Sequence, residues 1–93
     1  MRLSNFEIDV IKQSIHKHDP EALVYLFGSR ADDTKKGGDI DLLIISKKIK
    51  AADKIDLKAA IFEKLEEQKI DIVVAKNKGK PFVRLALKQG VLL

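Results

Sequence analysis

The chain has 93 residues, of which 45% are hydrophobic and 34% are charged, the balance of an ordinary globular protein. A chain of this length supports one thin hydrophobic core, so we expect a single domain over residues 1–93. The absence of cysteine excludes a disulfide framework, a thiolate nucleophile and a cysteine-ligated zinc site. The net charge of +4 favours anionic partners, but it does not choose among nucleotides, nucleic acid and acidic protein surfaces.

Membrane and secretory functions find no support in the sequence. No apolar run approaches the roughly 20 residues of a membrane span, and the N-terminus lacks a signal-peptide pattern. We therefore expect a soluble, cytoplasmic protein with no membrane partner. The only two histidines, His16 and His18, lie at a predicted helix end, so a multi-histidine metal site is not expected.

The first predicted element is a helix over residues 5–18. Ser4 and Glu7 have the spacing of a capping box at its start. Asp19 and Pro20 end it, because a residue that precedes proline avoids the helical region.

Two strands and a connecting segment follow. The apolar run 23–27 predicts a buried strand that ends at Gly28. A short helix over 29–33 and a loop over 34–38 lead to a second strand over 39–45. The fully apolar second half of this strand is typical of a central strand with both faces covered.

Two further helices and a third strand complete the order. Asp53 is the expected N-cap of a helix over 54–68, and the run 70–75 predicts the third strand. Pro81 begins a last helix, and Gly90 is its expected C′ residue. The core stripes that we expect on these two helices are Ile55, Ala59, Phe62 and Leu65, with Ile61 beside them, and Phe82, Leu85, Ala86 and Gln89.

The order of helices and strands predicts an α+β fold, with a two-layer α/β arrangement. We expect a small mixed sheet of three to four strands with the helices packed mainly on one face. Residues 91–93 remain to pair with the sheet or to pack against it.

The first candidate site is the turn at Gly28 and Ser29, between a predicted strand and a predicted helix. Glycine lets the backbone approach a ligand closely, and the N–H groups at a helix start attract phosphate oxygens. The Ser29 hydroxyl adds a donor, and Arg30 lies alongside. By itself, the same pattern also fits a plain turn and helix cap.

Three carboxylates form the second candidate site. Asp39 and Asp41 are two residues apart on a predicted strand, so their side chains point to the same face. Asp71 interrupts the apolar run of the third strand, where a carboxylate is costly unless it meets water, a cation or another partner. Mg²⁺ suits such a set, since it takes one or two carboxylates together with phosphates. The alternatives are a wet strand end for the first pair and a solvated edge strand for Asp71.

The spacing links the two candidate sites. Residues 30–38 provide enough chain for a short helix and a Gly-Gly loop to return to an adjacent strand, so the turn and the acids can face each other. The segments Leu-Phe-Gly-Ser-Arg-Ala (26–31) and Gly-Asp-Ile-Asp-Leu (38–42) resemble the pattern of the polymerase-beta-like nucleotidyltransferase superfamily. The resemblance is to its minimal nucleotidyltransferase (MNT) domains, and it covers nearly the whole chain from about residue 4. It implies the palm fold of that superfamily.

The resemblance implies roles for the residues of the turn. Gly28 and Ser29 would hold the triphosphate of the incoming nucleoside triphosphate, ATP being the expected donor, and Arg30 would assist. Many relatives carry glycine near positions 32 and 33, where this chain has Asp32 and Asp33. These two carboxylates would repel the triphosphate, although no ligand is lost.

The resemblance likewise implies roles for the acids. Asp39 and Asp41 would bind the catalytic Mg²⁺, with two ions expected, and Asp71 would bind metal and help to activate the attacking hydroxyl. Gly38 stands where many relatives have serine or threonine, and this change removes no ligand either. The implied reaction is a two-metal in-line displacement at the nucleotide.

The resemblance also implies a partner. MNT proteins are commonly paired with a small all-helical HEPN protein, a toxic ribonuclease, which they neutralise by adenylylating one of its tyrosines or by complex formation. We therefore expect transfer of AMP or another NMP to a hydroxyl of a HEPN-type partner protein, in an antitoxin role, with a homo- or hetero-oligomer as a further expectation.

Two other functions stay open. One is a non-catalytic binding module that neutralises a partner by complex formation, and the other is a small basic nucleic-acid-binding protein. The intact set of Ser29, Asp39, Asp41 and Asp71 favours the enzyme, because pure binding does not require it. The aromatic content of 5% offers no stacking platform for single-stranded nucleic acid.

Overall fold

The helices and strands lie close to their predicted positions. The computed structural model describes residues 3–31, 38–65 and 69–93, and only the backbone of Ser29. In chain order the elements are α1 (Asn5–His18), β1 (Leu23–Phe27), the 3₁₀ turn η1 (Gly28–Ala31), β2 (Ile40–Ile45), the 3₁₀ turn η2 (Ala51–Asp53), α2 (Lys54–Lys64), β3 (Ile70–Ala75), α3 (Pro81–Gln89) and β4 (Val91–Leu92). The predicted segments 32–37 and 66–68 lie outside the described residues.

The four strands form one mixed sheet in the order β3-β2-β1-β4. The inner pair β1 and β2 is antiparallel, β4 adds antiparallel to β1, and β3 runs parallel to β2. The end of the chain therefore pairs with the sheet, as one of the two expected outcomes for residues 91–93. The expected α+β fold with a small mixed sheet is confirmed.

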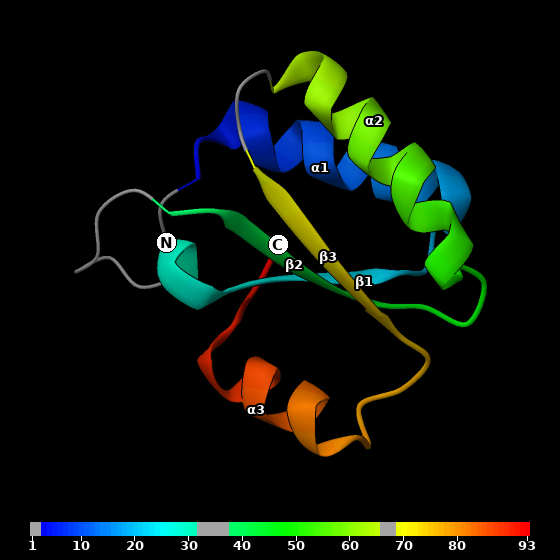
Figure 1. Cartoon of the computed structure of the whole chain (residues 1–93), viewed down its shortest axis with the longest axis vertical. Coiled ribbons are helices and arrows are strands. Elements are labelled where there is room, and N and C mark those ends of the chain that lie inside the picture. The colour runs from blue at the N-terminus through cyan, green and yellow to red at the C-terminus, as the bar shows by residue number, and fades with distance from the viewer. Residues whose placement is uncertain (1–2, 32–37, 66–68) are drawn as a thin grey trace.

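The sheet separates the helices into two layers (Figure 1). Helices α1 and α2 cover one face, where the main hydrophobic core lies, and α3 lies against the other face. The second, smaller cluster is centred on Leu43, Val83 and Ala86. The main core includes Val10, Ile11, Ile15, Val24, Leu26, Ile40, Leu42, Ile44, Leu57, Ile61, Ile70 and Ile72.

Capping groups explain where the helices begin. Ser4 and Glu7 form the predicted box, with Ser4 N–H donating to Glu7 Oε1 at 2.9 Å and Glu7 N–H donating to Ser4 Oγ at 3.1 Å. Asp53 makes no side-chain capping bond to α2. Its carboxylate instead accepts a hydrogen bond from Lys50 N–H at 2.8 Å, which closes the 3₁₀ turn before the helix.

The core-facing stripe of α2 differs from the prediction. Leu57, Ile61 and Leu65 face the core, whereas Ile55 is 78% exposed and Phe62 is 53% exposed. Both sets have helical spacing, and only the packing of α2 against α1 and the sheet decides which one is buried. The prediction was correct for Leu65 and Ile61 and wrong for Ile55, Phe62 and Ala59.

Helix α3 shows the same kind of correction. It buries Val83 and Ala86, while Phe82 and Leu85 are more than half exposed. Gly90 has an extended backbone rather than the left-handed conformation expected of a C′ glycine. A Cβ at this position would lie 2.8 Å from the backbone oxygen of Ala86 in α3 and 3.2 Å from that of Leu26 in β1, so the close approach of α3 and β1 explains the glycine.

Candidate active site

The parallel pairing of β2 and β3 brings two of the predicted acids side by side. Asp41 is the register partner of Asp71, and on its other side it is the register partner of Phe27. Asp39 immediately precedes β2, two positions from Asp41, and all three carboxylates are half-buried. β3 is an edge strand, so Asp71 lies at the rim of the sheet and not in an inner strand.

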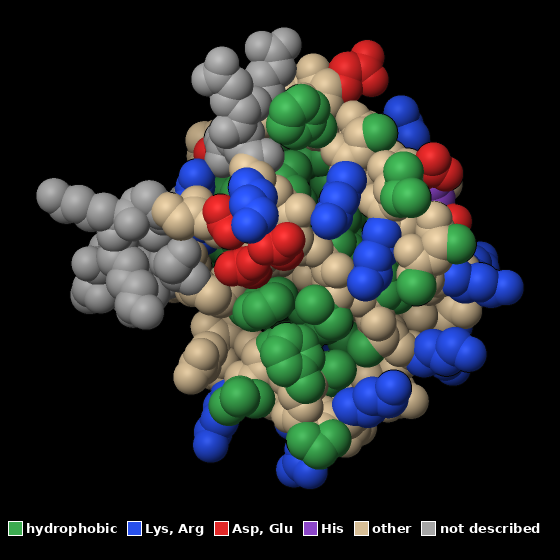
Figure 2. Space-filling model, in the orientation of Figure 1, with side chains coloured by type: hydrophobic (Ala, Val, Ile, Leu, Met, Phe, Trp, Pro, Cys, Tyr) green, Lys and Arg blue, Asp and Glu red, His purple; other side chains and the backbone are tan. Residues whose placement is uncertain are grey.

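The acids lie on the face of the sheet that α3 partly covers. Alternation along β2 places Asp41 on the same face as Leu43 and Ile45, which belong to the α3 cluster. The same alternation places Asp71 with Val73 and Ala75 of that cluster. In Figure 2 the acidic side chains are gathered directly beside a group of apolar ones.

The carboxylates interact electrostatically. Burial raises the pKa of Asp41 above its ordinary value of 3.8, and the charges of Asp71 and Asp39 raise it further. A hydrogen bond with the Asp71 side chain acts in the same direction, while Lys69 opposes it. The Lys69 ammonium lies 3.6 Å from Asp39 Oδ2, but the Lys69 side chain is largely in solvent, so this pair contributes little to stability.

The glycine of the turn packs directly against Asp41. Gly28 has a φ of +73°, which favours glycine, and a Cβ at this position would overlap Asp41 Oδ2. The absence of a side chain thus lets the start of η1 approach the carboxylate. Ser29 follows within the same 3₁₀ turn, so its backbone lies next to this contact.

Arg30 connects the turn to the segment that precedes the acids. Its Nε donates a hydrogen bond to the carbonyl oxygen of Gly38 at 3.2 Å. The predicted turn and the predicted acids are therefore neighbours, as the spacing indicated. Asp32 and Asp33 lie outside the described residues.

The donor set fits a hard divalent cation by its chemistry. Three oxygen-donor side chains share one patch, and their repulsion disfavours the charged form of Asp41, which a nearby cation would restore. Within residues 3–31, 38–65 and 69–93, no three His, Cys, Asp or Glu side chains stand close enough together to hold an ion. The patch thus has the ligand types for Mg²⁺, while its side chains as they stand do not enclose one.

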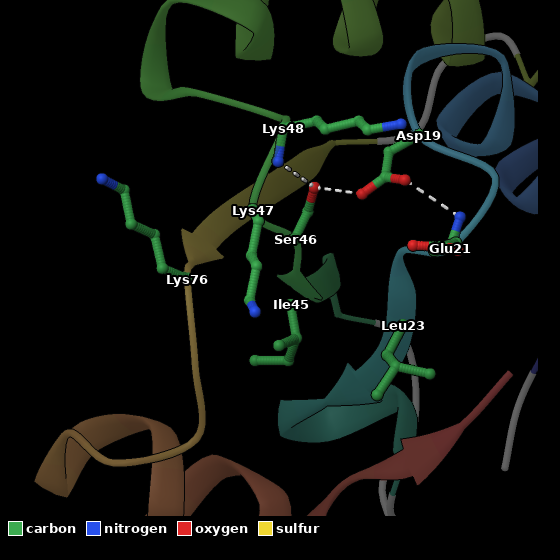
Figure 3. Close-up of a pocket in the computed structure, with 8 residues that line it drawn as sticks. All are labelled: Asp19, Glu21, Leu23, Ile45, Ser46, Lys47, Lys48 and Lys76. Atoms are coloured by element: carbon green, nitrogen blue, oxygen red, sulfur yellow. Dashed lines mark hydrogen bonds between the residues drawn. The ribbon is translucent and has the colours of Figure 1, made fainter.

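A hollow lies at the end of the sheet opposite to the acids (Figure 3). It has a volume of about 330 Å³, and β1 begins and β2 ends there. The sequence gives no sign of it, because its parts come from three separate loops. The lining residues are Asp19, Glu21, Leu23, Ile45, Ser46, Lys47, Lys48 and Lys76.

Hydrogen bonds within the protein satisfy the buried acid of this hollow. Ser46 Oγ donates to Asp19 Oδ2 at 2.6 Å, and Glu21 N–H donates to Asp19 Oδ1 at 2.9 Å. These bonds lower the pKa of Asp19 below 3.8, with smaller contributions from the charges of Lys48 and His16. Asp19 therefore joins the end of α1 to the segment after β2, which is a structural role.

Comparison with known proteins identifies the family of the chain. The profile of the family described as polymerase beta, nucleotidyltransferase matches residues 9–93, and the chain belongs to that family. No curated protein matches the sequence. Among the residues that the structure describes, none of the helices combines the length and the apolar character that a membrane crossing requires.

Proposed function

From membership of the nucleotidyltransferase family, we propose that this protein transfers a nucleoside monophosphate, AMP in the first instance, from its triphosphate to a hydroxyl of a partner protein. One observation carries the proposal. The parallel register pairs Asp41 with Asp71, and Gly28 packs against the same carboxylate, which supports a single site made of the acids and the turn.

The residues of this site have separate roles in the proposed reaction. The backbone N–H groups at Gly28 and Ser29 bind the triphosphate at the start of η1. Asp39, Asp41 and Asp71 would hold Mg²⁺, which supplies Lewis-acid activation of the hydroxyl and neutralises the leaving pyrophosphate.

Proton transfer falls to Asp71. It lies at the rim of the sheet, where an acceptor can reach it, and its carboxylate accepts the proton of the attacking hydroxyl. Arg30 holds the segment before Asp39 through the carbonyl of Gly38, and so it positions the acids relative to the turn. Placement and electrostatic stabilisation supply most of the rate enhancement in a reaction of this kind.

The resemblance to MNT proteins supports the choice of acceptor. We propose a HEPN-type helical protein as the partner and an antitoxin role for the reaction. The acids lie on a face of the sheet that α3 covers only in part, and this open face supports a macromolecular acceptor.

Transfer of α-labelled nucleotide tests the proposal. Purified protein is incubated with each of the four labelled nucleoside triphosphates, Mg²⁺ and the product of the neighbouring gene as the candidate acceptor. We expect label on the partner, most from ATP, and a loss of at least about 100-fold with Asp41→Asn. Asp9→Asn is the matched control, because Asp9 is an exposed aspartate on α1.

The other outcomes are equally informative. Equal neutralisation of the partner by wild type and Asp41→Asn, without label, would show a binding module instead of an enzyme. Salt-sensitive binding to RNA without nucleotide transfer would support the nucleic-acid-binding alternative. Omission of Mg²⁺ in the presence of a chelator should abolish the label, and label that persists would contradict the metal assignment.

A further inference from the structure

We propose that the acceptor polypeptide binds as an extended strand along the outer edge of β3. In this arrangement a hydroxyl side chain stands opposite Asp71, and a neighbouring apolar side chain enters a hollow beside Phe62. The acceptor role rests on the proposed transfer reaction, whereas strand binding itself does not require it.

The outer edge of β3 has backbone groups available for pairing. β3 is the last strand of the sheet order, and its ladder to β2 includes bonds from Ile40 N–H to Lys69 O and from Ser46 N–H to Ala75 O, both at 2.9 Å. Alternation along a parallel ladder then directs the N–H and C=O groups of Ile72 and Val74 to the other side. An edge of this kind is a template for another strand.

This edge is accessible. Figure 1 looks onto it, with β3 in front of the other strands, α2 above and α3 below. Among the described residues, no segment lies across β3 in this view.

A hollow lies next to this edge, between α2 and the start of β3. It has a volume of about 330 Å³ and a mainly apolar lining from α2 and the start of β3, namely Lys58, Ala59, Phe62, Lys69 and Ile70. Phe62 is 53% exposed. Ile55, which lies about two turns before Phe62 on the same side of α2, is 78% exposed. Large apolar side chains exposed beside an unpaired strand edge are typical of a peptide-binding surface.

Alternation of side chains links the hollow to the acids. A residue paired with Asp71 in an added strand points to the α3 face, next to Asp71 and Asp41. Its immediate neighbours point to the α2 face, toward the hollow at Phe62 and Ile70. The predicted acceptor is thus a serine, threonine or tyrosine directly adjacent to a large apolar residue, with acidic residues nearby to pair with Lys58 and Lys69.

The edge favours a polypeptide over a nucleic acid. Its available partners are backbone donors and acceptors that match another peptide backbone, and the hollow beside them is apolar. In the proposed step the acceptor oxygen forms a bond to the α-phosphorus as the bond to pyrophosphate breaks, and the hydroxyl proton moves to the Asp71 carboxylate. The products are the nucleotidylated polypeptide and pyrophosphate.

A binding experiment tests the strand directly. The probe is a short blocked peptide with a central Phe-Ser pair flanked by valine and threonine and ending in glutamate. We expect slower hydrogen exchange at the Ile72 and Val74 amides upon binding, with little change at Val73, which already faces β2. N-methylation of the peptide amides that face β3 should abolish binding, and N-methylation of the alternate amides should not.

Two exposed phenylalanines provide a matched pair of variants. Phe62 and Phe82 are exposed to a similar extent, 53% and 51%. Phe62→Ser should weaken peptide binding by about tenfold, whereas Phe82→Ser should leave peptide binding unchanged. Dependence on Phe82 instead would place the peptide across the α3 face and overturn the proposal. A dimer that Phe62→Ser dissociates would show that a second copy of the chain occupies the edge, which also overturns it.

Failure of this inference and failure of the proposed function have different results. Moving the serine by one position turns its hydroxyl to the α2 face, so binding should persist while nucleotide transfer is lost. Transfer to the partner protein without peptide protection of Ile72 and Val74 would refute only the strand. Strand binding without transfer to any acceptor would refute only the enzyme.

Discussion

At one end of the sheet an aspartate is surrounded by hydrogen-bond donors, and at the other end an aspartate is surrounded by acids. Asp19 is 3% exposed, and it accepts bonds from a hydroxyl and a backbone N–H, which lower its pKa. Asp41 is half-buried beside Asp71, with Asp39 two positions away in the chain, and its pKa is raised by burial and by the charges of these two acids. An ionised aspartate thus stabilises the fold at one end of the sheet and destabilises it at the other end.

This difference separates an acid with a structural role from an acid in the kind of environment that functional sites have. The Asp19 carboxylate has its partners within the chain, so the hollow around it requires no ligand to explain it. The strand register keeps the Asp41 carboxylate next to another acid, where its charged form is disfavoured. Such an environment is typical of sites that bind a cation or transfer a proton. Four predictions test whether the two ends differ in this way.

The largest effect is expected from Gly28→Ala. The side chain strains a backbone at φ +73° and displaces the Asp41 carboxylate, so we expect a loss of about 1–3 kcal/mol in unfolding free energy together with a loss of nucleotide transfer. Urea denaturation and the labelled transfer assay measure these effects. Gly79→Ala in an exposed turn is the control, and equal effects at both glycines would contradict the assignment of Gly28.

Ser46→Ala should affect stability alone. It removes the hydroxyl that donates to Asp19 and accepts from the Lys48 and Ile49 N–H groups, at a cost of about 1–3 kcal/mol. Nucleotide transfer at a temperature where the variant stays folded should be unchanged. Ser14→Ala, which loses only a bond to the Val10 carbonyl within α1, should cost less than about 0.5 kcal/mol. Lost transfer in folded Ser46→Ala would refute a purely structural role.

Asp41→Asn should stabilise the protein while it abolishes transfer. Replacing a crowded carboxylate with a neutral amide relieves the repulsion from Asp71 and Asp39, so the Tm at pH 7 should rise, by the equivalent of about 0.5 kcal/mol. Asp19→Asn should lower the Tm instead, because it removes a satisfied acceptor. Thermal unfolding of both variants distinguishes the two ends, and a Tm decrease for Asp41→Asn would refute the crowding of the acids.

The smallest effects are expected in the pH dependence of stability. The lowered pKa of Asp19 contributes stability above pH 3.8, and this contribution is lost as the pH falls through the folded-state pKa. The raised pKa of Asp41 acts in the opposite sense, because stability decreases as the pH rises from 3.8 through the raised value. Asp19→Asn should flatten the acid limb of the stability profile, and Asp41→Asn should flatten the limb above pH 3.8. Profiles with unchanged shapes would contradict both directions.

Local sequence signals were sufficient for most of the element boundaries. Ser4 and Glu7 cap α1, Pro20 limits it, and the apolar runs mark β1 and β3 at their observed ends. These features depend on residues a few positions apart, so the printed sequence contains them. Strand alternation also predicted a common face for Asp39 and Asp41, although β2 begins only at Ile40.

The tertiary structure decided the remaining features, and each depends on residues distant in the chain. It selected Leu57 and Ile61 as the buried stripe of α2, left Phe62 exposed, and joined Asp19 to Ser46 across 27 positions. It also set Asp71 beside Asp41 through a parallel register that no local pattern specifies. Residue types and short-range spacing therefore predicted the candidate site residues, while long-range packing alone brought them together, because only burial and strand pairing bring distant segments into contact.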